Sequence, residues 1–148
     1  MTEGSWHRND TLWRTIIDIN RCLFYADAEG IFSEKKRRRY LSIVDGIVAM
    51  EGNGPMDGAP KMAGCIIAAF NPVACDYVAA SIMGFDPAKI PSIREGFRLR
   101  KFPLAEFDPQ EIVVDSNDDR FKAIQQIYRE KSLKFQPPCG WRGKIERS

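Results

Sequence analysis

Two apolar runs joined by a short connection constrain the fold of this chain most strongly. The runs extend from Leu41 to Met50 and from Met62 to Phe70, and each has the length of a strand. The connection, from Glu51 to Lys61, is eleven residues long and contains two prolines, which leaves no room for the crossover helix that parallel strands need. We therefore predict two neighbouring antiparallel strands. Because both faces of each run are largely apolar, we expect both strands to be buried.

One helix is expected before this strand pair in the sequence and another after it. Asn71 followed by Pro72 is a typical helix start and Gly84 a typical stop, which predicts a helix from Pro72 to Met83. An earlier helix, capped by Asn9 or Asp10 and ending before Gly30, is indicated by helical periodicity. The stripe that predicts its buried face is Leu12, Ile16, Ile19 and Leu23, widened by Trp13, Ile17 and Phe24.

The rest of the chain predicts shorter elements. The proline-rich stretch 85–109 indicates short helical turns and loop, and residues Glu111 to Asp115 a third strand. A last helix is expected from Asp119 to Lys131, and after it an extended tail, residues 132–148. The residues expected to be buried here are Phe121, Ile124, Ile127 and Tyr128 in the helix, and Phe135 and Trp141 in the tail. The prediction is an α/β fold in one domain, residues 1–148, with a mixed β-sheet of three or more strands and helices packed against it.

Composition limits the classes of function. With 44% hydrophobic and 28% charged residues, the 148-residue chain can form one globular domain with a core. Its longest apolar run is too short to span a bilayer, and residues 1–10 contain no secretory hydrophobic region, so a cytoplasmic location is the default expectation. The net charge of +2 does not predict a polyanion binder, although Lys35 to Arg39 are five consecutive basic residues. Either these five bind nucleic acid, or they form a solvated turn near a helix C-terminus; nucleic acid is not the favoured partner.

Four segments carry a resemblance to a known family. They are WRTIIDINRCLFYAD, VDGI-x-x-x-EGNGP, NPVA-x-D-x-V-A-x-x-x-MGFDP and FQPPCGW, spread over nearly the whole chain. Together they resemble the domain of unknown function 362 family, whose members are typically longer; this chain is similar to their C-terminal half. The resemblance implies a fold and the location of a site, whereas the chemistry of that family is generally unassigned. Some relatives carry ferredoxin modules, but the four cysteines here include no C-x-x-C pair, so no iron–sulphur cluster is expected within this chain.

The first predicted strand and its C-terminal end hold the candidate catalytic residues, Asp45 on the strand and Glu51 directly after it. Carboxylates at the end of a buried strand can act as a general base or hold a divalent cation such as Mg²⁺. For Asp45 the structural alternative is that its side chain accepts hydrogen bonds from loop amides and fixes the turn. The sequence leaves both interpretations open.

Glycines and two further polar residues complete the predicted site. The amides of Gly52, Asn53 and Gly54 can form an anion-binding nest, with Lys61 either supplying the opposite charge or lying solvated at the strand edge. Asp76 is expected to face protein and to accept hydrogen bonds from amides of the Glu51 to Pro55 loop, as a support residue rather than a catalytic one. Asn71 is expected to support the site as a helix cap.

Three functions follow from these observations. The favoured one is an α/β domain that binds a small molecule, an anion or a metal at the loop from Asp45 to Lys61, with catalysis left open. The alternatives are a redox accessory protein that works with an iron–sulphur partner, which rests on the family alone, and a non-enzymatic nucleic-acid-binding module using Lys35 to Arg39. We also expect that a second copy of the chain, or a partner supplying the missing N-terminal half, covers exposed sheet surface.

Overall fold

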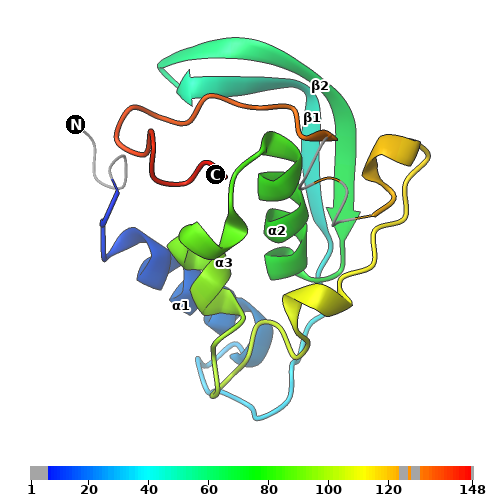
Figure 1. The fold of residues 1–148 in the computed structure, drawn as a ribbon. Coiled ribbons are helices and arrows are strands. Elements are labelled where there is room, and N and C mark those ends of the chain that lie inside the picture. The colour runs from blue at the N-terminus through cyan, green and yellow to red at the C-terminus, as the bar shows by residue number, and fades with distance from the viewer. Residues whose placement is uncertain (1–6, 124–126, 128–130, 148) are drawn as a thin grey trace.

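The computed structural model describes residues 7–123, 127 and 131–147, which form a layer of helices beneath one β-hairpin (Figure 1). The elements in chain order are α1 (Leu12–Tyr25), β1 (Ser42–Asn53), β2 (Asp57–Ala69), α2 (Pro72–Met83), η1 (Pro87–Lys89), α3 (Pro91–Gly96), η2 (Pro109–Glu111) and η3 (Asp119–Phe121), where η marks a 3₁₀ turn. The α/β character is therefore confirmed. The sheet of the described residues has two strands, both antiparallel, and the third strand is not found.

The hairpin confirms the antiparallel prediction and extends further than the apolar runs. Register runs from Ser42 opposite Ala69 to Asn53 opposite Asp57, with an irregularity between Gly46 and Val48. Most of the predicted connection is thus part of the ladder. The strands can continue through these polar and glycine residues because antiparallel strands need only a tight turn to connect them.

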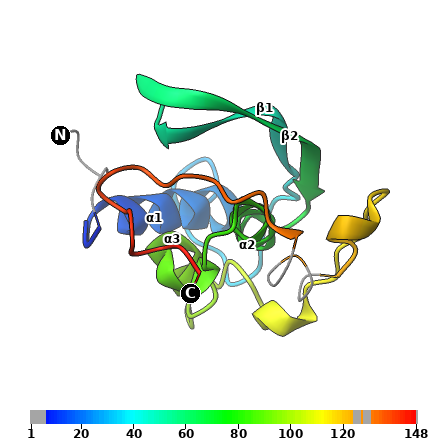
Figure 2. The same ribbon diagram turned by 45° about the horizontal axis from the view of Figure 1, so that its top comes forward.

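The prediction that both strands are buried is wrong for one face of the hairpin. Val44, Ala49, Cys65 and Ile67 point inward and are half-buried. The side chains that alternate with them are open to solvent, with exposed fractions of 65% for Ile43, 59% for Val48, 70% for Met62 and 62% for Ile66. The reason is that a sheet of two strands has α2 on one side only, as Figure 2 shows.

Helix α2 matches its sequence-based prediction at both ends. The Asn71 side chain accepts a hydrogen bond from the amide of Ala74 at 3.0 Å, so it satisfies a donor that the first helical turn leaves free. Gly84 ends the helix with φ of 92°, a left-handed conformation in which glycine carries no steric penalty. Its buried residues, among them Val73, Val78 and Ile82, then face the two hydrophobic clusters of the core.

Helix α1 forms where predicted but turns a different face to the core. Ile17, Phe24 and Tyr25 are buried, whereas Leu12, Ile16, Ile19 and Leu23 are between 38% and 62% exposed. Apolar residues surround most of this helix, so periodicity alone did not select the buried side. Specific contacts selected it: the hydroxyl of Tyr25 donates to the carbonyl of Pro103 at 2.6 Å. The N-cap residue is Thr11 rather than the predicted Asn9 or Asp10, but the Asn9 side chain still accepts from the amides of Thr11 and Leu12.

The predicted strand from Glu111 to Asp115 is an extended segment without a ladder partner. Its alternation is real, because Ile112 and Val114 pack on the smaller hydrophobic cluster while Val113 is 90% exposed. The alternation of side chains in this segment therefore indicates that one side of it is buried, and not that its backbone pairs with another strand. In the predicted last helix, η3 forms the first turn and Phe121 and Ile127 are buried; residues 124–126 and 128–130, with Ile124 and Tyr128, lie outside the described residues.

The C-terminal segment, residues 132–147, passes between the hairpin and the helices (Figure 2). Its backbone bonds to the end of α2, from the amide of Leu133 to the carbonyl of Ile82 and from that of Phe135 to Met83, both at 2.8 Å. Phe135 is buried and Trp141 packs against the main core, which confirms their predicted anchoring roles. Among the helices described, none is long and apolar enough to cross a membrane.

Candidate functional site

The predicted site residues near the hairpin turn bind the C-terminal segment. Glu51 Oε2 accepts hydrogen bonds from Lys61 Nζ at 2.8 Å and from the amide of Gln136 at 3.0 Å. The Lys61 ammonium and this amide hold the pKa of Glu51 below its ordinary value. Lys61 also donates to the carbonyl of Lys134 and lies 5.1 Å from the ring centre of Phe135.

Two residues of the predicted anion nest make similar contacts. The amide of Gly52 donates to the carbonyl of Gln136 at 2.9 Å, and Asn53 Oδ1 accepts from the amide of Cys139 at 2.8 Å. Lys61 is therefore neither free nor fully solvated, and the polar groups of this hairpin end fasten the segment above α2. Binding of an anion here stays a prediction, since it requires these groups to exchange partners.

Asp45 and Glu51 are not brought together. Asp45 lies opposite Ile66 on the exposed face of the hairpin, and its Oδ1 accepts from the amide of Ile47 at 3.0 Å. The two residues are six positions apart in the chain, which corresponds to about 20 Å of strand. Asp45 thus does accept a backbone hydrogen bond, although within a strand irregularity rather than a loop. Within the described part of the chain, no three or more histidine, cysteine or acidic residues cluster closely enough to hold a metal, and catalytic and metal roles stay predictions.

Asp76 is placed differently from its prediction. Its side chain is exposed on α2 and makes no hydrogen bond to the Glu51 to Pro55 loop, so that expected contact is wrong. The reason is that the hairpin end bonds the C-terminal segment instead. Nearby protein atoms still desolvate Asp76 and raise the pKa of its carboxyl above the ordinary value.

The basic run Lys35 to Arg39 contains several structural contacts. Arg38 Nη1 donates to the carbonyls of Leu23 and Ala26 at the C-terminal end of α1, at 2.7 and 2.6 Å. Lys36 donates to the carbonyl of Leu104 and pairs with Glu106 at 3.0 Å. The Arg38 contacts support the structural alternative of charges near a helix C-terminus, whereas Lys36 joins the run to residues 104–106.

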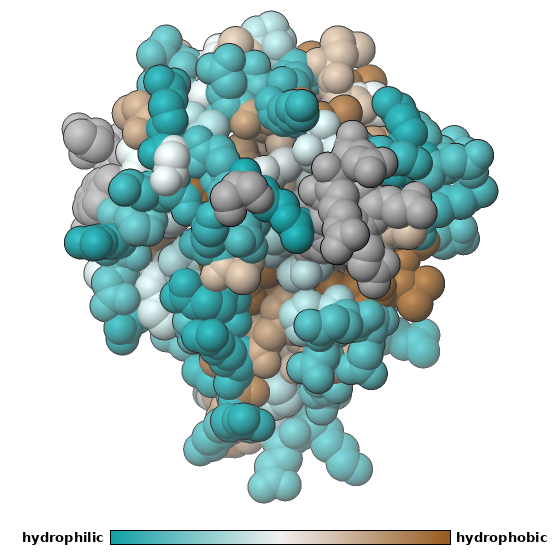
Figure 3. Space-filling view, in the orientation of Figure 1, coloured by the Kyte–Doolittle hydropathy of each residue, from teal (hydrophilic) through white to brown (hydrophobic). Residues whose placement is uncertain are grey.

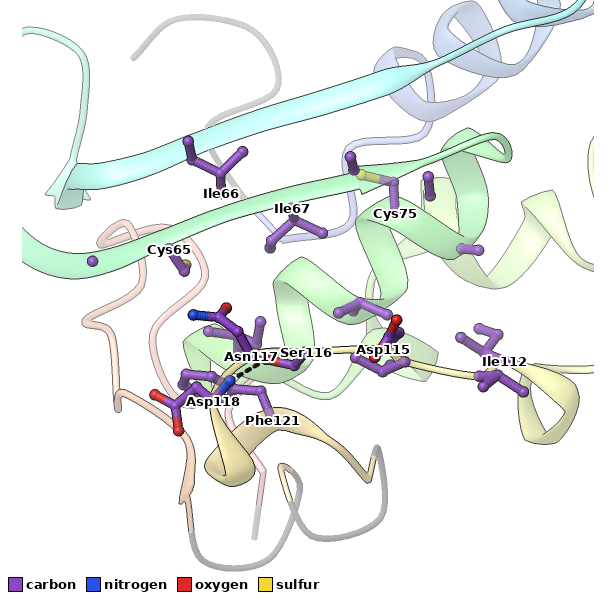
Figure 4. Close-up of a pocket in the computed structure, with 18 of the residues that line it drawn as sticks. Cys65, Ile66, Ile67, Cys75, Ile112, Asp115, Ser116, Asn117, Asp118 and Phe121 are labelled. Atoms are coloured by element: carbon purple, nitrogen blue, oxygen red, sulfur yellow. Dashed lines mark hydrogen bonds between the residues drawn. The ribbon is translucent and has the colours of Figure 1, made fainter.

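A pocket of about 570 Å³ lies between the inner side of β2, helix α2 and residues 112–118; we call it the hairpin pocket (Figure 4). Its apolar lining includes Cys65, Ile67, Cys75, Val78, Ile82, Ile112 and Phe121. Four consecutive polar residues, Asp115, Ser116, Asn117 and Asp118, line its other side. In Figure 4 the Asn117 side chain points from this segment toward Cys65. The hairpin pocket therefore combines an apolar surface with a short polar edge.

The polar edge is partly ordered by its own contacts. Ser116 Oγ accepts from the amide of Asp118 at 3.0 Å, the interaction drawn in Figure 4. Asp118 pairs with Arg120 at 2.6 Å, and hydrogen bonds from Arg120 lower the pKa of its carboxyl. No described residue forms an ion pair with Asp115 or a side-chain hydrogen bond with Asn117, so both can meet a ligand.

Two thiols lie in the same pocket, from β2 and from α2. Desolvation raises the pKa of Cys65 and of Cys75, and the nearby Asp76 carboxylate raises that of Cys75 further. Both cysteines are free and stay protonated at neutral pH, which makes them poor nucleophiles. They act here as small apolar side chains.

Sequence reasoning did not find the hairpin pocket because three separated segments form it. The signal was present in the run Asp115 to Asp118, four polar residues directly after an alternating stretch. In the sequence-based prediction only Asp115 belongs to an element, as the last residue of the strand from Glu111, and residues 116–118 fall before the helix expected from Asp119. Only the packing of Ile112 and Val114 against the smaller cluster brings it to the hairpin.

Comparisons with known proteins support the family resemblance over the N-terminal part of this chain, but not over the segment FQPPCGW. The family model described as "Domain of unknown function (DUF362)" matches residues 1–81, more than half of the chain, including the hairpin and most of α2. A thylakoid-associated protein of Synechocystis is 43% identical over 84 residues, covering 51% of this chain and 26% of the relative. The chain thus spans about a quarter of that relative's length. No solved structure matches the chain.

Proposed function

This chain belongs to the domain of unknown function 362 family, and we propose that it is a small-molecule-binding domain whose ligand occupies the hairpin pocket. The observation that carries this proposal is the pocket itself. Its volume of about 570 Å³ is in the range of ligand sites, and it has the usual composition of such sites, apolar lining with few polar groups.

The lining indicates the chemistry of the ligand. Ile67, Val78 and Phe121 offer an apolar surface, whereas the Asp115 carboxylate is acceptor-only. Asn117 can both donate and accept. We therefore expect a largely apolar molecule that carries a hydroxyl or amide donor at one end, rather than an anion.

This proposal moves the ligand site away from the polar hairpin end. Glu51 and Lys61 lie outside the hairpin pocket, and their contacts hold the C-terminal segment against the end of the hairpin. A direct role for Asp45, Glu51 or the Gly52 to Gly54 amides in binding or catalysis is the competing proposal. The two differ in what Glu51→Gln does to ligand binding.

The test uses 1-naphthol, a neutral apolar probe with one hydroxyl group, in a heteronuclear NMR titration. We expect saturable shifts at Ile67 and Val78, and a rise in melting temperature with probe concentration. Ala74 lines the pocket, so Ala74→Phe should fill part of it and weaken binding at least tenfold. Ala88 is exposed on η1, away from the pocket, so Ala88→Phe serves as the matched control and should bind like wild type.

Glu51→Gln separates the two sites. If the hairpin pocket binds the ligand, this variant keeps the saturable shifts at Ile67. Equal affinity of wild type and Ala74→Phe, or shifts confined to residues 51–61, would overturn the proposal in favour of the hairpin end.

A further inference from the structure

A second hollow, of about 360 Å³, lies on another face of α2; we call it the Asp76 groove. It is lined by Asp76, Ala79, Ala80 and Met83 of α2, by Phe85, Ile90, Ser92 and Ile93, and by Pro138, Trp141 and Ile145 of the C-terminal segment. The hairpin pocket instead uses Ala74, Cys75, Val78 and Ile82 of the same helix. The helix backbone therefore separates two hollows with different linings.

Asp76 alone carries a charge among the described residues that line this groove. The structure gives its carboxylate no ion pair or hydrogen bond to a described residue, and desolvation raises its pKa. Asp76 is exposed at the edge of the groove but partly desolvated by its apolar neighbours, so a positive charge or a hydrogen-bond donor beside its carboxylate is favourable. The groove is thus matched to a cation rather than to an anion.

Trp141 adds a second feature that favours a cation. Its indole lines the groove together with the ring of Phe85, and the faces of aromatic rings attract organic cations. An edge-on contact with His7, with ring centres 5.5 Å apart, orients the Trp141 ring. A carboxylate and an aromatic ring in one hollow are the two groups that ammonium sites commonly combine.

The groove continues beyond Trp141 toward α1. An adjoining hollow of about 180 Å³ shares Ile90, Ser92 and Trp141 with it and is otherwise lined mainly by Leu12, Trp13 and Ile16. This explains part of the exposed apolar side of α1. On the face seen in Figure 3, apolar residues reach the surface at several places between hydrophilic side chains. An apolar extension of the ligand therefore has a place to lie.

We infer that the Asp76 groove binds a small organic ammonium ion, with its charge beside Asp76 and Trp141 and its apolar part along Ile90 toward α1. The site is independent of the proposed hairpin-pocket function. Neither the hairpin pocket nor the Glu51 and Lys61 pair contributes a residue to it.

The test compares three probes of one shape and different charge, benzylammonium, benzyl alcohol and benzoate, by NMR titration at pH 7. Benzylammonium is expected to shift the Trp141 indole and the Ala79 amide saturably. Benzyl alcohol should bind at least tenfold more weakly, the effect of about 1.4 kcal/mol of charge interaction. Benzoate should give no saturable shift.

Variants connect the preference to named groups. Asp76→Asn keeps the shape of the side chain and should reduce benzylammonium affinity at least tenfold, whereas Asp18→Asn, an exposed acid of α1, should leave it unchanged. Trp141→Leu keeps an apolar lining but removes the aromatic ring. In this variant the affinity for benzylammonium should fall more than the affinity for benzyl alcohol. Ala74→Phe, which fills the hairpin pocket, should leave benzylammonium binding intact.

Two results would overturn the inference. One is equal affinity of wild type for benzylammonium and benzyl alcohol, which would make the groove merely apolar. The other is unchanged benzylammonium affinity in Asp76→Asn, which would assign the cation to another carboxylate. Loss of naphthol binding in Ala74→Phe with retained benzylammonium binding would show that the two sites are separate.

Discussion

The Lys61 ammonium lies 2.8 Å from the Glu51 carboxylate, and both groups also bond to the C-terminal segment. In the ladder Glu51 faces Ala59 and Lys61 faces Ala49, so the pair is a diagonal contact between neighbouring strands. The Glu51 carboxylate, which precedes Gly-Asn-Gly-Pro in the sequence, therefore has two structural partners, Lys61 and the amide of Gln136. Its first role is to join hairpin and C-terminal segment.

Replacing Glu51 by glutamine should destabilise the protein in a pH-dependent way. The pKa of Glu51 in the folded protein lies below the ordinary value of a glutamate, so the stabilisation is complete above the unfolded pKa and is lost as the pH falls through the folded pKa. We expect a lower urea midpoint for Glu51→Gln at pH 7. The difference from wild type should shrink as the pH is lowered below 4.5.

Asp57→Asn is the control for this prediction, because Asp57 is an exposed acid of the same hairpin. It should change the urea midpoint little at either pH. A midpoint difference between Glu51→Gln and wild type that stays constant from pH 7 to pH 3 would contradict the charge-based explanation.

Truncation of Ile127 tests the smaller hydrophobic cluster. Its side chain is fully buried at 0% exposure and packs with Val78, Ile82 and Phe121. Ile127→Ala should lower the free energy of unfolding by about 2–5 kcal/mol, as for other buried aliphatic truncations. Urea unfolding followed by circular dichroism measures this loss.

Ile19→Ala is the matched control, since Ile19 is 62% exposed on α1. The same substitution there should cost less than about 0.5 kcal/mol, as is usual for surface positions. A large loss at Ile19 would mean that the stripe predicted from the sequence, rather than the face with Ile17, carries the packing.

This contrast shows where the sequence was sufficient. Local chemistry determined α2, because Asn71, Pro72 and Gly84 act within one turn of the helix ends. The short connection between the two strands was enough to predict that they pair antiparallel. The buried face of α1 was not predictable in this way, since apolar residues on several sides fit equally well and the choice depends on contacts of Tyr25 and Phe24 distant in sequence.

The candidate site followed the same rule. The sequence identified Glu51, Asn53 and Lys61 as candidate site residues. Their partners in the C-terminal segment, however, lie more than 70 residues later in the chain. The hairpin pocket depends on how residues 112–118 pack against the smaller hydrophobic cluster. In the sequence, the alternation of Ile112 and Val114 looks like that of a strand, so this packing was not predicted. Local patterns thus located the residues, whereas long-range contacts decided their roles.

Removal of the α2 cap should weaken the fold without touching either hollow. The Asn71 side chain accepts from the amide of Ala74 and donates to the carbonyl of Leu104 at 2.8 Å. Asn71→Ala should cost about 1–2 kcal/mol, the usual effect of losing a helix cap. Thermal and urea unfolding both report this change.

Asn71→Asp separates the two contacts of this side chain. Aspartate keeps the acceptor for Ala74 but lacks the donor for Leu104, so its stability should lie between wild type and Asn71→Ala. If Asn71→Asp were as unstable as Asn71→Ala, the contact with Leu104, not the cap, would be the main contribution.

Arg38 provides the test of the basic run. Its guanidinium donates to the carbonyls of Leu23 and Ala26, where α1 leaves acceptors without helical partners. Arg38→Ala should therefore lower stability by about 0.5–1 kcal/mol, in the range for a cation at a helix C-terminus. Arg39→Ala removes an equal charge from the neighbouring position and should change stability much less. Equal losses in the two variants at low salt, both abolished at high salt, would instead indicate a general charge effect of Lys35 to Arg39, because a specific contact with two carbonyls depends on position and not only on net charge.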